Sequence, residues 1–265
     1  MPVCLCAQSE LCIGRSDTAY SAALNEMRTY LLHLPPGYND SPDASYPVIY
    51  LLDGDLFFHA LVALQHSYAG GRQPLMPACI IVGILNTDRT RDLTPTKSAY
   101  RRDGKLYDGD RALGGGSEAF TDYLGRELRS AINAAYRTNG KNIIVGHSFG
   151  GLFVLATLFR HPELFDACVA LDPSFWWDNG LIARMAEELR PVPSFAGKKL
   201  YVGVATQMRR DSINIHWQIA DDFRSRLIPA AIANGLDAKW KDFGEESHGT
   251  IPIPGMADAF KTLFK

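Results

Sequence analysis

The segment Gly146-His-Ser-Phe-Gly150 carries the clearest chemical signal in this sequence. It follows a short apolar run at 142–145 and precedes a stretch with helical spacing. In such a strand–turn–helix, the glycines leave room for a tight bend that lifts the serine hydroxyl clear of the sheet. The first N–H groups of the helix would face the oxyanion that forms when Ser148 attacks a carbonyl. We interpret Ser148 as a nucleophile; the alternative is a glycine-rich turn with an incidental serine.

The elements that must position this serine alternate along the chain. We expect strands over 27–34, 46–52, 79–85, 142–145, 166–171, 199–205 and 239–243, and helices over 56–68, 117–136, 150–159, 181–189, 214–233 and 256–264. Runs that are apolar throughout are typical of a parallel sheet covered on both faces. We predict one α/β domain over residues 1–265, with a doubly wound, mostly parallel sheet flanked by helices. Residues 86–116 interrupt the alternation and predict a long polar insertion over one end of the sheet.

A serine hydroxyl needs a base to take its proton, and the chain has seven histidines. In α/β-hydrolases, which share this strand–turn–helix arrangement, the order is serine, acid, histidine, which leaves three candidates. His161 ends the helix after the serine and is too near in the chain to fold back to it, and His216 lies in a helical pattern. His248 lies in a loop beyond the last expected strand. It is the predicted base, the alternative being an ordinary surface histidine.

The acid of such a triad should follow the penultimate strand, where it can orient the imidazole. Asp211 is the carboxylate in that loop. It could equally cap the next helix, because aspartate is a favoured capping residue. The alternatives are Asp172 or Asp178 after the preceding strand, or a serine–histidine dyad supported by Glu246 or by backbone.

Two amide donors should form the oxyanion hole. One is the N–H of Phe149, directly after the nucleophile, and the other should come from the loop Asp53-Gly54-Asp55. Because a glycine lets the backbone turn its amides inward, the N–H of Asp55 is the candidate, followed by that of Gly54. A plain turn is the alternative.

Aromatic and cationic residues suggest where a substrate would bind. Trp176 and Trp177 follow a strand at the same sheet edge as the serine, where ligands bind in open α/β folds, and are candidates for lining an acyl or aryl pocket. Arg89, in the insertion, could bind an anionic or catechol-like group through its paired donors and its stacking face. The alternatives are tryptophans divided between core and surface, and a solvated loop with internal ion pairs.

Composition excludes several other classes. The 27 Lys+Arg against 29 Asp+Glu give a net charge of −2, which argues against nucleic-acid binding. No apolar run reaches the roughly 18 residues of a membrane span. The five cysteines have no metal-ligand spacing, and we expect no metal or cofactor, with Cys79 and Cys168 as core residues. The N-terminus does not form a complete signal peptide, and the compartment stays open: cytoplasmic as the sequence is written, or periplasmic if a leader was trimmed.

Several segments together resemble an esterase family of the α/β-hydrolase superfamily. This family includes siderophore esterases of the enterobactin, salmochelin and bacillibactin type, esterase D and feruloyl esterases. The segments that carry the resemblance are residues 46–54, 86–95, 114–120, 146–151, 172–177 and 246–249. The resemblance implies an α/β-hydrolase fold with Ser148 and His248 as nucleophile and base, and the siderophore branch is the most similar because of the Arg89-x-x-Asp-x-Thr-Pro95 run. The chain departs from the family at Thr206-Gln207, where relatives have an acid, and at Asp172, where Ser is usual.

We therefore expect a serine-dependent carboxylic ester hydrolase that acts on a small-molecule ester, with a catecholate siderophore trilactone as the favoured substrate. A general acyl or aryl esterase of feruloyl type and an acyltransferase would use the same residues. The apparent loss of the acid favours one other class, a hydrolase fold that only binds a ligand. A peptidase is the weakest alternative, because peptide hydrolysis demands more of the acid. Sequence leaves the oligomeric state open.

Overall fold

The computed structural model describes residues 12–107, 112–188, 194–207 and 215–264. Eight strands form one sheet in the order β1-β2-β4-β3-β7-β8-β9-β10. They are β1 (Arg15–Ser21), β2 (Glu26–His33), β3 (Tyr46–Leu51), β4 (Ile80–Ile84), β7 (Thr138–His147), β8 (Ala167–Leu171), β9 (Lys199–Ala205) and β10 (Asp237–Phe243). The pairs from β4 to β10 are parallel, whereas β1–β2 and β2–β4 are antiparallel.

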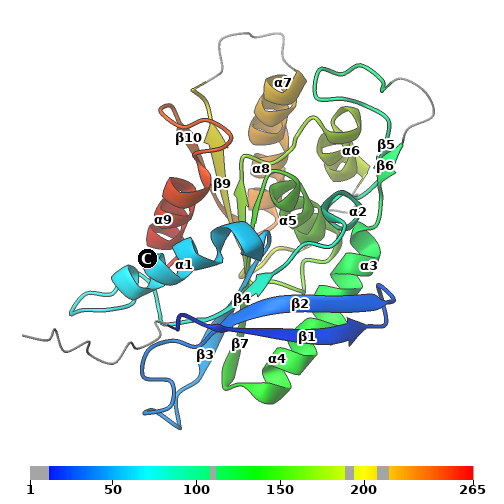
Figure 1. Cartoon of the computed structure of the whole chain (residues 1–265). Coiled ribbons are helices and arrows are strands. Elements are labelled where there is room, and N and C mark those ends of the chain that lie inside the picture. Colours follow the sequence, from blue (N-terminus) through cyan, green and yellow to red (C-terminus); the bar gives the residue numbers. More distant parts are fainter. Residues whose placement is uncertain (1–11, 108–111, 189–193, 208–214, 265) are drawn as a thin grey trace, which may run out of the picture.

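Helices cover both faces of this sheet (Figure 1). They include α1 (Gly54–Tyr68), α5 (Phe149–Arg160), α6 (Leu181–Glu188) and α9 (Pro252–Leu263). Two longer helices each contain a π-helical turn: α3 (Ser117–Asp122) runs through Tyr123–Leu128 into α4 (Arg129–Ala135), and α7 (Ile215–Asp222) runs through Phe223–Leu227 into α8 (Ile228–Ala233). The structure thus has the predicted doubly wound, mostly parallel architecture. Within the described residues, no helix combines the length and apolar composition needed to cross a bilayer.

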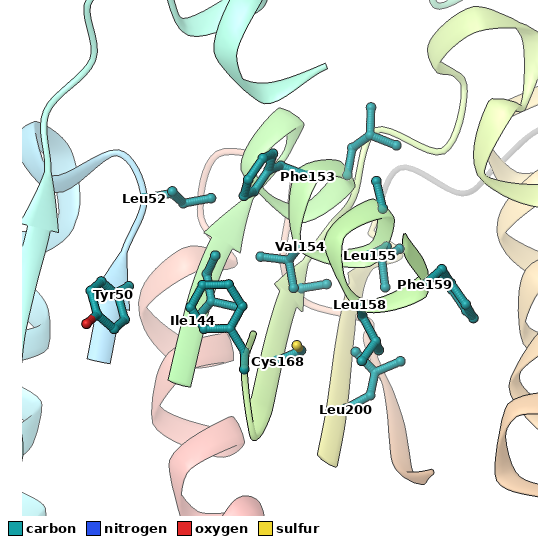
Figure 2. Close-up of a cluster of buried hydrophobic side chains, with 14 of the residues drawn as sticks. Tyr50, Leu52, Ile144, Phe153, Val154, Leu155, Leu158, Phe159, Cys168 and Leu200 are labelled. Carbon is teal, nitrogen blue, oxygen red and sulfur yellow. The ribbon is translucent and has the colours of Figure 1, made fainter. Parts of the chain in front are cut away.

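The strands separate two apolar layers because successive side chains point to opposite faces. In β3, Ile49 and Leu51 pack with α1 and α9, whereas Val48 and Tyr50 belong to the larger cluster on the opposite face. Helix α5 is apolar around most of its circumference and is buried from residue 150 to 159. Figure 2 shows Val154 and Leu158 of this helix close to strand side chains of the sheet. The helix that follows the serine is therefore a rigid core element.

Three features differ from the sequence-based expectation. Strand β1, which we did not predict, pairs with β2 at the edge of the sheet, and its side chains are mostly exposed. Strand β7 is longer than predicted because its polar first half, with Gly140 at a positive φ, hides the strand pattern. The insertion contains α2 (Arg89–Leu93) and a small antiparallel pair, β5 (Lys97–Ser98) with β6 (Leu113–Gly114).

Polar contacts hold the insertion on the sheet. Arg28 of β2 is 1% exposed and donates to the carboxylate of Asp92 at 2.7 Å. Removing one partner of a buried ion pair leaves an uncompensated charge, so this pair fixes where α2 lies. Just after α2, the carbonyl of Thr96 accepts a hydrogen bond from the indole Nε1 of Trp177 at 3.3 Å.

The turn between β7 and α5 brings two backbone segments close together. Ser148 has φ 61° and ψ −117°, a conformation that L-residues rarely adopt. A Cβ atom at Gly146 would lie 2.3 Å from the carbonyl oxygen of Gly150. Only a glycine at 146 lets the helix start this close to the strand.

We predict that Gly146→Ala destabilises the protein by about 2–3 kcal/mol or more, because the added methyl group clashes with backbone that cannot rotate away. Urea unfolding followed by circular dichroism measures this loss. The matched control is Gly244→Ala, since an added Cβ there has no described heavy atom within 4 Å outside its chain neighbours. Equal unfolding midpoints for the two variants would show that the turn can accommodate a Cβ atom at residue 146.

Candidate active site

Three side chains form a chain of hydrogen bonds at the carboxyl edge of the sheet. Nε2 of His248 lies 3.1 Å from Oγ of Ser148. Nδ1 of the same imidazole lies 2.5 Å from Oδ2 of Asp172. Because a carboxylate accepts from Nδ1–H, a neutral imidazole in this position has its unprotonated Nε2 toward the serine hydroxyl, the tautomer that a general base requires. The arrangement can activate Ser148 as a nucleophile.

Asp172 is held at the end of β8 by its own backbone and by the next strand. Its side chain is 2% exposed, and its φ of 40° turns the chain sharply after Leu171. Oδ1 accepts the amide N–H of Ala205 in β9 at 3.1 Å, which leaves Oδ2 for His248. Both carboxylate oxygens therefore have partners, as a buried charge requires.

The acid position on His248 is thus occupied by Asp172, one of the alternatives weighed from sequence. The favoured candidate, Asp211, lies outside the described residues, so its assignment stays a prediction. Asp178 instead accepts from Thr96 Oγ1 at 2.9 Å. The signal for Asp172 was its replacement of the usual serine in the 172–177 segment, at a strand end adjacent to β9.

Ser174, which the sequence analysis did not single out, lies next to the nucleophile. Its Oγ is 3.3 Å from Oγ of Ser148, and its amide donates to the carbonyl of Ser148 at 3.1 Å. The amide of Ser148 in turn donates to the carbonyl of Leu171 at 3.0 Å. These bonds tie the strained turn to the β8 loop, while Ser148 itself stays only half-buried.

The two predicted oxyanion donors stand at the starts of two helices. Phe149 is the first residue of α5, and Asp55 is the second residue of α1. Neither amide donates a hydrogen bond within the described structure, as expected for N–H groups of a first helical turn. The loop at Asp53 lies beside the serine turn, since its carboxylate would be 3.4 Å from a Cβ at Gly150. Their role in binding an oxyanion stays a prediction.

Arg89, the predicted anion-binding residue, makes structural contacts. Its Nε and Nη2 donate to the two oxygens of Asp53 at 2.6 and 2.9 Å, and Nη2 also donates to the carbonyl of His147 at 3.2 Å. The Asp53 side chain has no exposed surface, so the pair fixes the α1 loop against the serine turn. With its side chain 32% exposed, substrate binding by Arg89 stays a prediction.

The two predicted substrate tryptophans differ in exposure. Trp177 is buried and meets the ring of Phe149 edge-on at 5.0 Å between centroids. Trp176 is half-buried and lines a cleft of about 630 Å³ with Arg101, Arg102, Asp103 and Tyr107 of the insertion. Its ring lies 5.8 Å from that of Phe149, the residue after the nucleophile. Trp176 therefore connects the cleft to the residue that follows the serine.

Fold and site together define a serine hydrolase with the α/β-hydrolase fold. The family model described as "Putative esterase" matches residues 21–226, and the chain belongs to this family. It is 34% identical to a ferri-bacillibactin esterase of Bacillus subtilis, over 91% of this chain and 87% of the relative. A siderophore enterobactin esterase of Emericella nidulans is 27% identical, with 86% of each chain covered. The crystal structure of an IroE-like serine hydrolase from Shewanella oneidensis matches with a TM-score of 0.86 and 34% identity, over 95% of this chain and 80% of that one.

Membership of this family makes the protein an ester hydrolase and confirms the predicted family, fold and reaction class. In the part of the chain that the structure describes, no group of three or more His, Cys, Asp or Glu residues is placed to hold a metal ion.

We predict that Asp172→Asn lowers kcat for ester hydrolysis by about 10³–10⁴-fold, because an amide neither stabilises the imidazolium nor fixes its tautomer. Turnover of p-nitrophenyl butyrate measures the effect. Asp211→Asn tests the sequence-based assignment and is expected to change kcat by less than about tenfold, as a group outside the reacting chain does. A larger loss of kcat in Asp211→Asn than in Asp172→Asn would assign the acid to Asp211, in the loop after β9.

Proposed function

We propose that this protein hydrolyses the ester bonds of a catecholate siderophore trilactone, with Ser148 as nucleophile, His248 as general base and Asp172 as the acid that orients it. The observation that carries the reaction is the continuous Asp172–His248–Ser148 hydrogen-bond chain. The relatives named as siderophore esterases support the substrate class.

The reaction follows from these positions. Oγ of Ser148 attacks the ester carbonyl carbon while its proton passes to Nε2 of His248. The amides of Phe149 and Asp55 stabilise the oxyanion, and Asp172 stabilises the imidazolium. The imidazolium then gives its proton to the departing alcohol oxygen, leaving an acyl-serine. Water, deprotonated by the same imidazole, attacks this ester. The bond to Oγ of Ser148 then breaks, the imidazolium returns its proton to that oxygen, and the acid is released.

The cleft supports a substrate with anionic, aromatic arms. Arg102 is exposed and makes no hydrogen bond or ion pair with any described residue, whereas Arg101 pairs with Asp103 at 3.7 Å. Trp176 and Tyr107 supply aromatic surface in the same cleft. A guanidinium offers both paired donors and a stacking plane, which suits a catecholate and its iron complex.

The Asp172–His248 bond and the cleft residues also bear on the other candidate functions. An inactive binding protein was favoured by the missing acid, and the bond between Asp172 and His248 counts against it. An acyltransferase would share every residue of the reaction and differ only in the alcohol that replaces water. A general aryl esterase would use Trp176 without needing Arg102.

A substrate panel tests the proposal. It contains ferric and iron-free catecholate trilactones, feruloyl esters and p-nitrophenyl acetate and butyrate, with and without added alcohol. We expect kcat/KM for a trilactone to exceed that for p-nitrophenyl butyrate by at least about 100-fold, because the remote arms contribute binding energy to the transition state. Ser148→Ala should lower turnover by at least about 10³-fold. Equal rates for wild type and Ser148→Ala would refute a serine esterase, and preference for the simple esters would refute the siderophore substrate.

We predict that Arg102→Gln raises KM for the ferric trilactone by about tenfold, the loss of one charge-assisted contact, and leaves p-nitrophenyl acetate turnover unchanged. Steady-state kinetics on both esters measure the difference. Arg126→Gln, which removes an 81%-exposed guanidinium on the helix from Ser117 to Ala135, is the matched control. If both variants bind the trilactone as wild type does, Arg102 is not part of the substrate site.

A further inference from the structure

His147, the residue before the nucleophile, contacts the catalytic base and not the cleft. Its Nε2 lies 2.8 Å from the main-chain carbonyl oxygen of His248, and the two imidazole rings lie 4.5 Å apart between centroids. A carbonyl oxygen can only accept, so Nε2 of His147 is the donor. The proposed mechanism gives this residue no step.

Hydrogen bonds in the loop between β10 and α9 (residues 244–251) involve the residues on either side of His248. The amides of Thr250 and Ile251 donate to the carbonyl of Ser247 at 3.1 Å each, and the amide of Gln207 donates to the carbonyl of Glu246 at 3.2 Å. These bonds hold the ends of the loop. Among the described residues, His147 makes the one hydrogen bond to the main chain of His248.

We propose that His147 is a positioning residue that fixes the backbone of His248, so that the imidazole meets Asp172 and Ser148 at the same time. This inference rests on the proposed catalytic roles. The imidazole is then anchored at two points, at its own carbonyl and at Nδ1. Since His147 is covalently joined to Ser148, nucleophile and base are linked through one hydrogen bond and one peptide unit.

The surroundings of His147 suit this role. The ring of Phe57 packs edge-on at 5.9 Å, and the carbonyl of His147 accepts from Arg89 at 3.2 Å. Burial, together with the nearby His248, lowers the pKa of His147 to about 4. His147 is then neutral near pH 7, and it does not oppose the positive charge that His248 gains when it takes the serine proton.

The test compares His147→Gln with His147→Met, two unbranched side chains of similar length of which only glutamine donates a hydrogen bond. With p-nitrophenyl butyrate we expect His147→Met to lose about 10- to 100-fold in kcat with KM within about twofold, because a misplaced base slows the chemical step and leaves binding intact. His147→Gln should retain kcat within about threefold of wild type. His59→Met, at an exposed position on α1, is the control and should match wild type.

A second readout does not depend on turnover. The Nδ1–H proton of His248, in its short bond to Asp172, should give a low-field proton NMR signal in the wild type and in His147→Gln. This signal should shift upfield or broaden in His147→Met, with thermal unfolding confirming that the variant is folded.

The inference is overturned if His147→Met keeps wild-type kcat, if His147→Gln loses as much kcat as His147→Met, or if the signal is the same in all three proteins. Should His147→Met fail to fold, wild-type kcat and signal in His147→Gln support the inference, and a loss of either overturns it. Failure of the proposed function is seen separately, as equal activity of Ser148→Ala and wild type.

Discussion

The strained turn at Ser148 is the constraint on which the site depends. A non-glycine residue held at φ 61° and ψ −117° costs about 1–3 kcal/mol, and it persists only where its surroundings determine it. Here the apolar helix α5 is buried on the sheet, and the bonds to Leu171 and Ser174 lock the turn from the β8 side. The strained residue lies half-buried at the sheet edge, directly before the first turn of α5.

Around this turn, three loops from different parts of the chain converge. The α1 loop is held through the ion pair of Asp53 with Arg89, the β8 loop contributes Asp172 and Ser174, and the loop after β10 contributes His248. Each loop is fixed by a charge-assisted bond that is buried on at least one side, and such bonds lose little strength to solvent. A set of loops thereby reaches the precision that catalysis requires.

The parts of this arrangement that could be predicted from sequence are those encoded locally. Gly146, Ser148 and Gly150 form one contiguous pattern between a strand and a helix, and His248 follows the last strand in the order that this fold imposes. The acid was harder to assign because β8 and β9 end side by side, so either following loop can reach the imidazole. The ion pair of Arg89 with Asp53 could not be predicted, because the two residues are 36 positions apart in the sequence. Strand β1 carries exposed side chains and thus no apolar pattern to detect.

Different residues of the insertion attach it to the rest of the protein and line the cleft. The contacts of Arg28 with Asp92 and of Trp177 with Thr96 hold the insertion before residues 99–107, and the bond from the amide of Gly116 to the carbonyl of Arg91 holds it after them. The cleft residues belong to the turn between these contacts, which backbone bonds from Arg101 to Lys105 and from Tyr107 to Ala99 close. Sequence changes within 99–107 therefore alter the wall of the cleft without disturbing the reacting groups. Exchanging this turn for a loop of different sequence would therefore change which ligands the cleft binds, while the residues around Ser148 stay the same.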